Sequence, residues 1–320
     1  MFIYFWIMLQ KQVRSILNRH KQRDGWFLTD YSVNPYEGCS CNCLYCYIRG
    51  SKYGANMDEG LVMKSNALEI LEKQLHARAK KGQYGFVAVG SATDAYMHHE
   101  EKWKLTQAML KLLLKYRFPI FISTKTALIS RDVDLLKQID ETAILPADLK
   151  TSLGRGVILS TSVSSMEPEI TKMLEPRAAP PTERLKILSQ LKQQGFLTGV
   201  NAIPILPFIS DTQEQLEKII AATKQSGADY VLVGGLTLFG QQPADSKTLY
   251  FNFLKRYDPN LIRKYEALYG TNSFPPKHYV AKLNSRAKAL CAKYDIRISI
   301  LSQHGQIPER NTAGTQNKLF

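Results

Sequence analysis

The stretch Cys39-Ser40-Cys41-Asn42-Cys43-Leu44-Tyr45-Cys46 places four cysteines within eight residues of a 320-residue chain that has five in all. Cysteines this close together cannot all pair as unstrained disulfides, but they can surround one metal centre. Clustering of this kind is typical of metal ligation in a reducing compartment rather than of a secreted disulfide framework. We therefore predict a metal centre in a cytoplasmic protein.

Short apolar segments alternate with amphipathic ones on the carboxyl-terminal side of this stretch. We predict strands at 85–90, 119–123, 157–160, 196–205 and 230–235 after an extended segment at 26–36, and helices at 61–80, 100–116, 131–139, 182–194 and 211–225. This alternation is typical of βαβ units and a parallel sheet covered on both faces. A full barrel needs eight units, and about six are present. The predicted fold class is therefore α/β, a partial (βα)6 TIM-type barrel with a C-terminal helical extension.

These patterns also divide the chain. We predict an N-terminal arm at 1–30, the partial barrel at 31–240, the helical extension at 241–305 with a last strand at 296–301, and a disordered tail at 306–320. The apolar first nine residues are too short to span a membrane, so no membrane partner is expected. They are either a helix end packed on the domain or an artefact of start choice, with Met8 as the alternative initiator.

The chain is strongly basic, with a net charge of +14 and a pI near 9.4. An excess of this size attracts polyanions through counterion release, which makes nucleic acid a candidate partner. The lysines and arginines are spread along the chain, so a soluble enzyme with a basic surface is an equally open interpretation.

Within the cysteine cluster, Cys39, Cys43 and Cys46 have the spacing C-x-x-x-C-x-x-C, with an aromatic residue before the last cysteine. A loop of this kind followed by βα alternation resembles the radical S-adenosylmethionine (SAM) superfamily. Further blocks resemble, in the same order, those of the spore photoproduct lyase-like group, often labelled DNA repair photolyases. They are Asn34-Pro35-Tyr36-Glu37-Gly38-Cys39, Gly90-Ser91-Ala92-Thr93-Asp94-Ala95-Tyr96, Thr124-Lys125, Arg131-Asp132, Glu175-Pro176, Arg184-Leu185 and Pro204.

The resemblance implies that Cys39, Cys43 and Cys46 hold a [4Fe–4S] cluster with one open iron, and that Cys41 is a bystander. Such an iron chelates SAM, and an electron from a donor such as flavodoxin or ferredoxin then releases a 5′-deoxyadenosyl radical. That radical abstracts hydrogen from a substrate, here expected in nucleic acid. Two alternatives stay open: an enzyme of the same class acting on a peptide or small metabolite, and a non-catalytic nucleic-acid-binding protein containing zinc or a cluster.

Five further residues are candidates for binding SAM, although the catalytic residues themselves cannot be named. Tyr45 is expected near the adenine, Lys125 at the carboxylate, Thr93 and Asp94 near the methionine amino group, and Ser160 near the ribose. Four of them also have an ordinary interpretation. The lysine can be a solvated surface residue, Thr93 and Asp94 can serve turn and helix-cap chemistry, and the serine can be a simple strand-end hydroxyl.

Several other polar residues have structural interpretations. Glu175 and Arg184 are expected to form an ion pair that stiffens the rim of the barrel. The run His98-His99-Glu100-Glu101 is a helix start enriched in carboxylates rather than a metal site, because adjacent histidines point apart on a helix. Cys291 is expected to be a small buried hydrophobe.

The chain departs from spore photoproduct lyases at Ser91. Lyases of that group carry a cysteine in this loop, which returns a hydrogen atom to the product radical. A serine O–H bond is too strong to serve as that donor. Repair of the spore thymine dimer is therefore not expected of this chain unless Cys41 or Cys291 reaches the site.

Overall fold

The computed structural model describes residues 8–51, 54 and 60–301. These residues form two compact units. The first unit contains residues 8–40, 60–159 and 301, and the second unit contains residues 41–51, 54 and 160–300. Within the described residues the chain changes units after Ser40, after Leu159 within strand β8 (Val157–Ser162), and after Ile300. The apolar start at 1–7 and the tail at 306–320 lie outside the described residues, and the predicted domain boundaries stay predictions.

The first unit contains two sheets. In the larger sheet the order is β2 (Asn18–Arg19), β3 (Thr29–Val33), β6 (Phe86–Val89), β7 (Ile120–Ser123) and the beginning of β8, with β3, β6 and β7 parallel and β2 antiparallel to β3. The smaller sheet has the order β1 (Met8–Lys11), β5 (Leu61–Lys64), β4 (Tyr36–Glu37). All four residues of β6 are buried, because parallel strands are covered on both faces.

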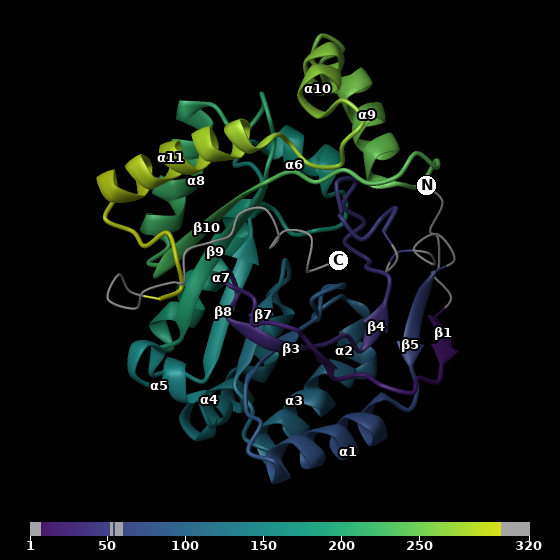
Figure 1. The fold of residues 1–320 in the computed structure, drawn as a ribbon, viewed down its shortest axis with the longest axis vertical. Coiled ribbons are helices and arrows are strands. Elements are labelled where there is room, and N and C mark those ends of the chain that lie inside the picture. The colour runs from purple at the N-terminus through teal and green to yellow at the C-terminus, as the bar shows by residue number, and fades with distance from the viewer. Residues whose placement is uncertain (1–7, 52–53, 55–59, 302–320) are drawn as a thin grey trace. The chain divides into compact units, whose positions relative to one another are not determined.

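Helices follow the strands of the first unit. They are α1 (Ala67–Lys80), α2 (His99–Trp103), α3 (Leu105–Lys115), the 3-10 helix η1 (Ala127–Asp132), α4 (Val133–Thr142) and α5 (Ala147–Leu153). Helix α1 packs against α3 and α3 against α4, as Figure 1 shows. Leu71 and Leu75 lie one helical turn apart on α1 and are fully buried. The same spacing places Met109 and Leu113 of α3 in the core.

The second unit continues the βα pattern. The end of β8, β9 (Leu197–Ile205) and β10 (Tyr230–Gly235) lie in this order, with β9 and β10 parallel. The helices are α6 (Pro168–Leu174), α7 (Pro181–Gln193), α8 (Gln213–Gln225), α9 (Ser246–Tyr257), α10 (Leu261–Tyr269) and α11 (Lys277–Lys293). Cys291 is 3% exposed in a core with Val200, Ile220 and Val231, which confirms its expected role as a buried hydrophobe.

The α/β class is confirmed, with six strands that alternate with helices (β3 and β6 to β10) and a helical C-terminal part, in agreement with the expected partial barrel. Three local predictions are wrong. Residues 61–64 form β5 instead of the start of a helix, because they pair with β1. The helix at 100–116 is broken at Lys104, whose φ is +50°. The strand at 296–301 is reduced to one bridge between Arg297 and Tyr230. Among the described helices, none has the length and apolarity that crossing a bilayer requires.

A buried carboxylate organises the loops of the first unit. Glu100 of α2 is 0% exposed and accepts hydrogen bonds from the Tyr36 hydroxyl at 2.5 Å, the Thr106 N–H at 3.0 Å and Arg131 Nη2 at 3.0 Å. Arg131 also pairs with Asp132 at 2.8 Å. The carboxylate therefore joins β4, the start of α3 and η1. The expected helix start rich in carboxylates is present, but one of its two glutamates faces inward.

We expect Glu100→Ala to destabilise the chain by about 3–5 kcal/mol, because it leaves the half-buried Arg131 without one of its carboxylates and the Thr106 N–H without its acceptor. Urea denaturation followed by fluorescence measures the loss. Glu101→Ala is the matched control, since Glu101 is the exposed neighbour on the same helix and should change stability by less than about 0.5 kcal/mol. Equal losses in the two variants would contradict the role of Glu100.

Candidate functional site

The cysteine segment forms a loop of turns after β4, as expected. All five cysteines of the chain are thiols, with Cys41 and Cys43 buried and Cys39 and Cys46 half-buried. Cys39 belongs to the first unit and the other three to the second unit. Within the part of the chain that the structure describes, no three His, Cys, Asp or Glu side chains are gathered in a metal-binding group. The ligand set Cys39, Cys43 and Cys46 therefore stays a prediction.

Contacts from the loop after β6 hold the backbone around Cys39. The Thr93 hydroxyl donates to the Gly38 carbonyl at 2.5 Å, and the Ser40 N–H lies 3.1 Å from the Met97 sulfur. Gly38 has a φ of +79°, a left-handed conformation that favours glycine and turns the chain directly before the first predicted ligand. Thr93 thus positions the cysteine loop. Its predicted contact with the methionine amino group stays a prediction.

Asp94 joins the carboxyl ends of β6 and β7. Its carboxylate accepts hydrogen bonds from the Tyr96 N–H at 2.9 Å, the Thr124 hydroxyl at 2.7 Å and the Lys125 N–H at 2.8 Å. The first contact is the turn chemistry expected of Asp94, and the other two reach the neighbouring strand. Because Asp94 fixes the backbone of Lys125, the first unit brings these two candidates together. Their contacts with SAM are not tested by this geometry.

In the second unit, Tyr45 lies in a buried network centred on Glu175. The Glu175 carboxylate accepts hydrogen bonds from the Tyr45 hydroxyl and from the Ser164 hydroxyl, the latter at 2.8 Å, and it pairs with Arg184. Glu175 and Arg184 side chains are each 1% exposed, so the expected ion pair is confirmed. Burial lowers the pKa of Arg184, while the charges of Glu175, Tyr45 and Cys43 raise it, and the net shift is upward. Arg184 is therefore a permanent cation near Cys43.

Sequence reasoning missed Arg49, a second buried cation beside the cysteines. Arg49 is 5% exposed, and its guanidinium donates to the carbonyls of Cys43 at 3.3 Å and Ala244 at 3.2 Å and to the Asn42 side chain. Its only signal in the sequence is its place three residues after Cys46. Nearby cations favour the thiolate form of cysteine, which is the form that ligates iron. The two arginines therefore fit a thiolate at Cys43, as a metal centre there would need.

Ser160 and Ser91 are also placed by their neighbours. The Ser160 and Tyr230 hydroxyls are 2.6 Å apart and both side chains are buried. Ser160 lies within β8, which continues to Ser162, so the prediction that it ends the strand is wrong. Its ribose contact stays a prediction.

Ser91 is exposed at the end of β6, where its hydroxyl accepts from the Asn34 side chain at 3.1 Å. Asn34 also accepts from the Ala92 N–H at 2.7 Å, so the loop that carries Ser91 is held against the end of β3.

The model of the radical SAM superfamily matches residues 33–223, and this range is more than half of the chain. The chain belongs to the radical SAM superfamily. Membership implies an enzyme that uses a [4Fe–4S] cluster and SAM.

Known proteins resemble the chain along most of its length. An uncharacterized protein of Mycobacterium tuberculosis is 29% identical over 270 residues, covering 82% of this chain and 74% of that protein. A radical SAM Nα-GlyT isomerase of Pseudomonas phage M6 is 21% identical over 252 residues, covering 78% of this chain and 48% of that protein. A solved spore photoproduct lyase has a TM-score of 0.64 and 13% identity, covering 90% of this chain and 79% of that one. This last likeness shows a shared fold.

We expect Glu175→Ala to destabilise the second unit by about 3–5 kcal/mol, because the buried Arg184 loses its counter-charge. The melting temperature and the iron bound after anaerobic reconstitution should both fall, since Glu175 also holds Tyr45 beside Cys46. Glu169→Ala is the matched control, because Glu169 is exposed on α6 of the same unit. A normal melting temperature and iron content in Glu175→Ala would refute the structural role of this network.

Proposed function

We propose that this radical SAM enzyme abstracts a hydrogen atom from a substrate within nucleic acid. The observation that carries the proposal is the net charge of +14, an excess suited to a polyanionic substrate. One comparison supports it. Spore photoproduct lyase, which shares the fold, has been solved in complex with a dinucleoside spore photoproduct. The phage relative is a Nα-GlyT isomerase of the same superfamily, so enzymes related to this chain do not all perform one reaction.

Within the proposal, Cys39, Cys43 and Cys46 hold the cluster, and Arg49 and Arg184 balance the charge of its thiolates. When bound, the cluster and SAM supply a 5′-deoxyadenosyl radical after one-electron reduction. A small donor such as flavodoxin or ferredoxin is the proposed source of that electron. The buried, hydrogen-bonded surroundings of Cys43 and Arg184 exclude water from this side of the centre, which protects a reactive radical.

The proposed SAM contacts use side chains whose backbones are already fixed. Lys125 supplies a cation for the carboxylate, and its main chain is held by Asp94. Thr93 and Asp94 lie at the end of β6, where the amino group is expected, and both are buried. Tyr45 presents its ring to the adenine while its hydroxyl is bound to Glu175, and Ser160 faces the ribose. Because these groups are preorganised, SAM binding orders few side chains.

Ser91 limits the type of reaction. A lyase that reverses a thymine lesion needs a thiol to return hydrogen to the product radical, and the hydroxyl at this position cannot do so. Cys291 lies in the core of the second unit, and burial raises its pKa to about 12. We therefore propose lyase-like hydrogen abstraction without thiol-based return at this loop, and not repair of the spore thymine dimer.

Cys43→Ala should abolish formation of 5′-deoxyadenosine after anaerobic reconstitution and dithionite reduction, because an iron loses its ligand. Cys41→Ala is the matched control: Cys41 lies in the same loop, is also buried, and should retain most of the activity. Chromatography of the quenched reaction measures the product, and iron analysis reports the cluster. Loss of activity in Cys41→Ala with Cys43→Ala active would reverse the assignment of ligands.

Deuterium tracing tests the substrate class. The reconstituted enzyme is incubated with SAM, reductant and a uniformly deuterated oligonucleotide, and 5′-deoxyadenosine is analysed by mass spectrometry. Incorporation of deuterium is expected, because the radical takes its hydrogen from the nucleic acid. If 5′-deoxyadenosine forms without deuterium from DNA or RNA, the substrate is instead a peptide or small metabolite, and the proposal is overturned.

A further inference from the structure

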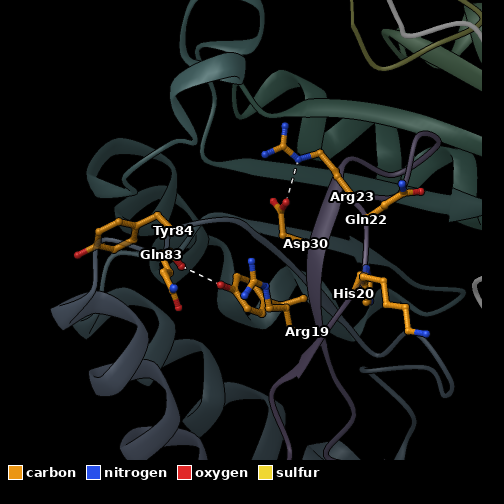
Figure 2. Close-up of a pocket in the computed structure, with 9 residues that line it drawn as sticks. Arg19, His20, Gln22, Arg23, Asp30, Gln83 and Tyr84 are labelled. Atoms are coloured by element: carbon orange, nitrogen blue, oxygen red, sulfur yellow. Dashed lines mark hydrogen bonds and ion pairs between the residues drawn. The ribbon is translucent and has the colours of Figure 1, made fainter.

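A basic hollow of about 250 Å³ lies in the first unit, away from the carboxyl ends of the strands. Its lining includes Arg19, Lys21, Arg23, Asp30 and Tyr84. Figure 2 shows how the side chains of Arg19, Arg23, Asp30 and Tyr84 lie around it. Asp30 lies near the start of β3 and Tyr84 just before the start of β6. The candidate SAM contacts of this unit follow the opposite ends of β6 and β7. The hollow and these candidate contacts are one strand length apart, which is about 15 Å at about 3.3 Å per residue.

The backbone that carries the basic residues is fixed before any ligand arrives. Residues of β2 pair with β3, and the His20 N–H donates to the Asp30 carbonyl at 2.8 Å. The turn between the strands is closed by Asp24, whose side chain accepts from the Trp26 and Phe27 N–H groups at 2.8 and 2.7 Å. A ligand therefore meets a preformed hairpin and not a mobile arm.

The charges of the hollow divide into two groups. Arg23 is neutralised locally, because Nε lies 3.0 Å from Asp30 and the guanidinium also pairs with Asp148. Arg19 and Lys21 are exposed and form no ion pair with a described residue. The lining therefore keeps two uncompensated positive charges, and Asp30 does not cancel them because Arg23 already occupies it. Two cations that line the same hollow suit the oxygens of a phosphate group.

The basic surface is larger than a single phosphate group needs. A second hollow of about 170 Å³ is lined by Arg78 and Lys81 at the end of α1. The Arg78 guanidinium donates to the Gln83 side chain at 2.7 Å, and Gln83 lines the first hollow. This hydrogen bond joins the linings of the two hollows, and each lining carries cations. A chain of phosphates matches this arrangement better than a single phosphorylated metabolite does.

We propose that these hollows bind the phosphate backbone of a nucleic-acid strand, with Arg19 and Lys21 contacting a phosphate outside the reacting nucleotide. This inference rests on the proposed function and states how the enzyme holds its nucleic-acid substrate. The Tyr84 ring, at 5.1 Å from Phe118, is packed on one side and half-buried, so it offers an aromatic surface to a base or sugar of the same strand. Contacts of this kind position a strand without reading its sequence.

Fluorescence anisotropy with a labelled single-stranded 20-mer tests the site, using the reconstituted full chain without SAM. The logarithm of the association constant is plotted against the logarithm of the salt concentration. Loss of two phosphate contacts should make the slope of this plot about 1.4 less negative, at about 0.7 per contact for single strands. At 50 mM salt the same loss weakens binding about 10- to 100-fold in Arg19→Gln/Lys21→Gln. Tyr84→Leu should weaken binding without changing the salt slope. Circular dichroism verifies that the variants are folded.

Lys255→Gln/Arg256→Gln is the matched control, because it removes one exposed lysine and one exposed arginine from α9. It should change affinity less than about threefold. Equal weakening in the two double variants, or an unchanged salt slope in Arg19→Gln/Lys21→Gln, would overturn the site. If tripolyphosphate displaced the 20-mer with an affinity equal to that of the 20-mer, the ligand would be a small phosphate compound, and the proposed site would also be overturned. Because binding is measured without turnover, failure here is distinct from failure of deuterium transfer.

Discussion

The Asp94 carboxylate is buried, and a buried charge is tolerated only when several donors surround it. Its three partners are the Tyr96 N–H, the Thr124 hydroxyl and the Lys125 N–H, so it joins the ends of β6 and β7. Glu100 and Glu175 obey the same constraint in other loops of their respective units. The polar loops that follow the strands are thus ordered by buried carboxylates, and the candidate cofactor contacts take their positions from that order.

The cysteine loop depends on charge as well as on spacing. Three thiolates around one cluster concentrate negative charge, and buried cations offset it better than solvent-screened surface lysines. Arg49 binds the Cys43 carbonyl, and Arg184 carries a charge near the same residue. Tyr45 is tied to Arg184 through Glu175, so the aromatic residue of the motif shares a network with the counter-charge. The proposed metal ligation and the stability of the loop therefore rest on the same side chains.

The two ends of the strands in the first unit have different chemistry. Their carboxyl ends carry Asp94 and Lys125, whereas the amino ends of β3 and β6 border the hollow with Arg19 and Lys21. Parallel strands create this division, because every carboxyl end meets one edge and every amino end the other. The proposed enzyme uses one edge for the reaction and the other to hold the strand that carries its substrate.

The sequence alone determined the superfamily, the α/β class and the ion pair of Glu175 with Arg184, because cysteine spacing, βα periodicity and ordered blocks are local signals. It did not reveal Arg49 or the hydrogen bond of Tyr45 to Glu175, whose partners are 130 residues apart. Residues 61–64 were misassigned for the same reason, since their strand exists only by pairing with β1. Tertiary structure decided which polar side chains are buried together, because desolvation depends on every neighbour in space and local sequence specifies only those along the chain.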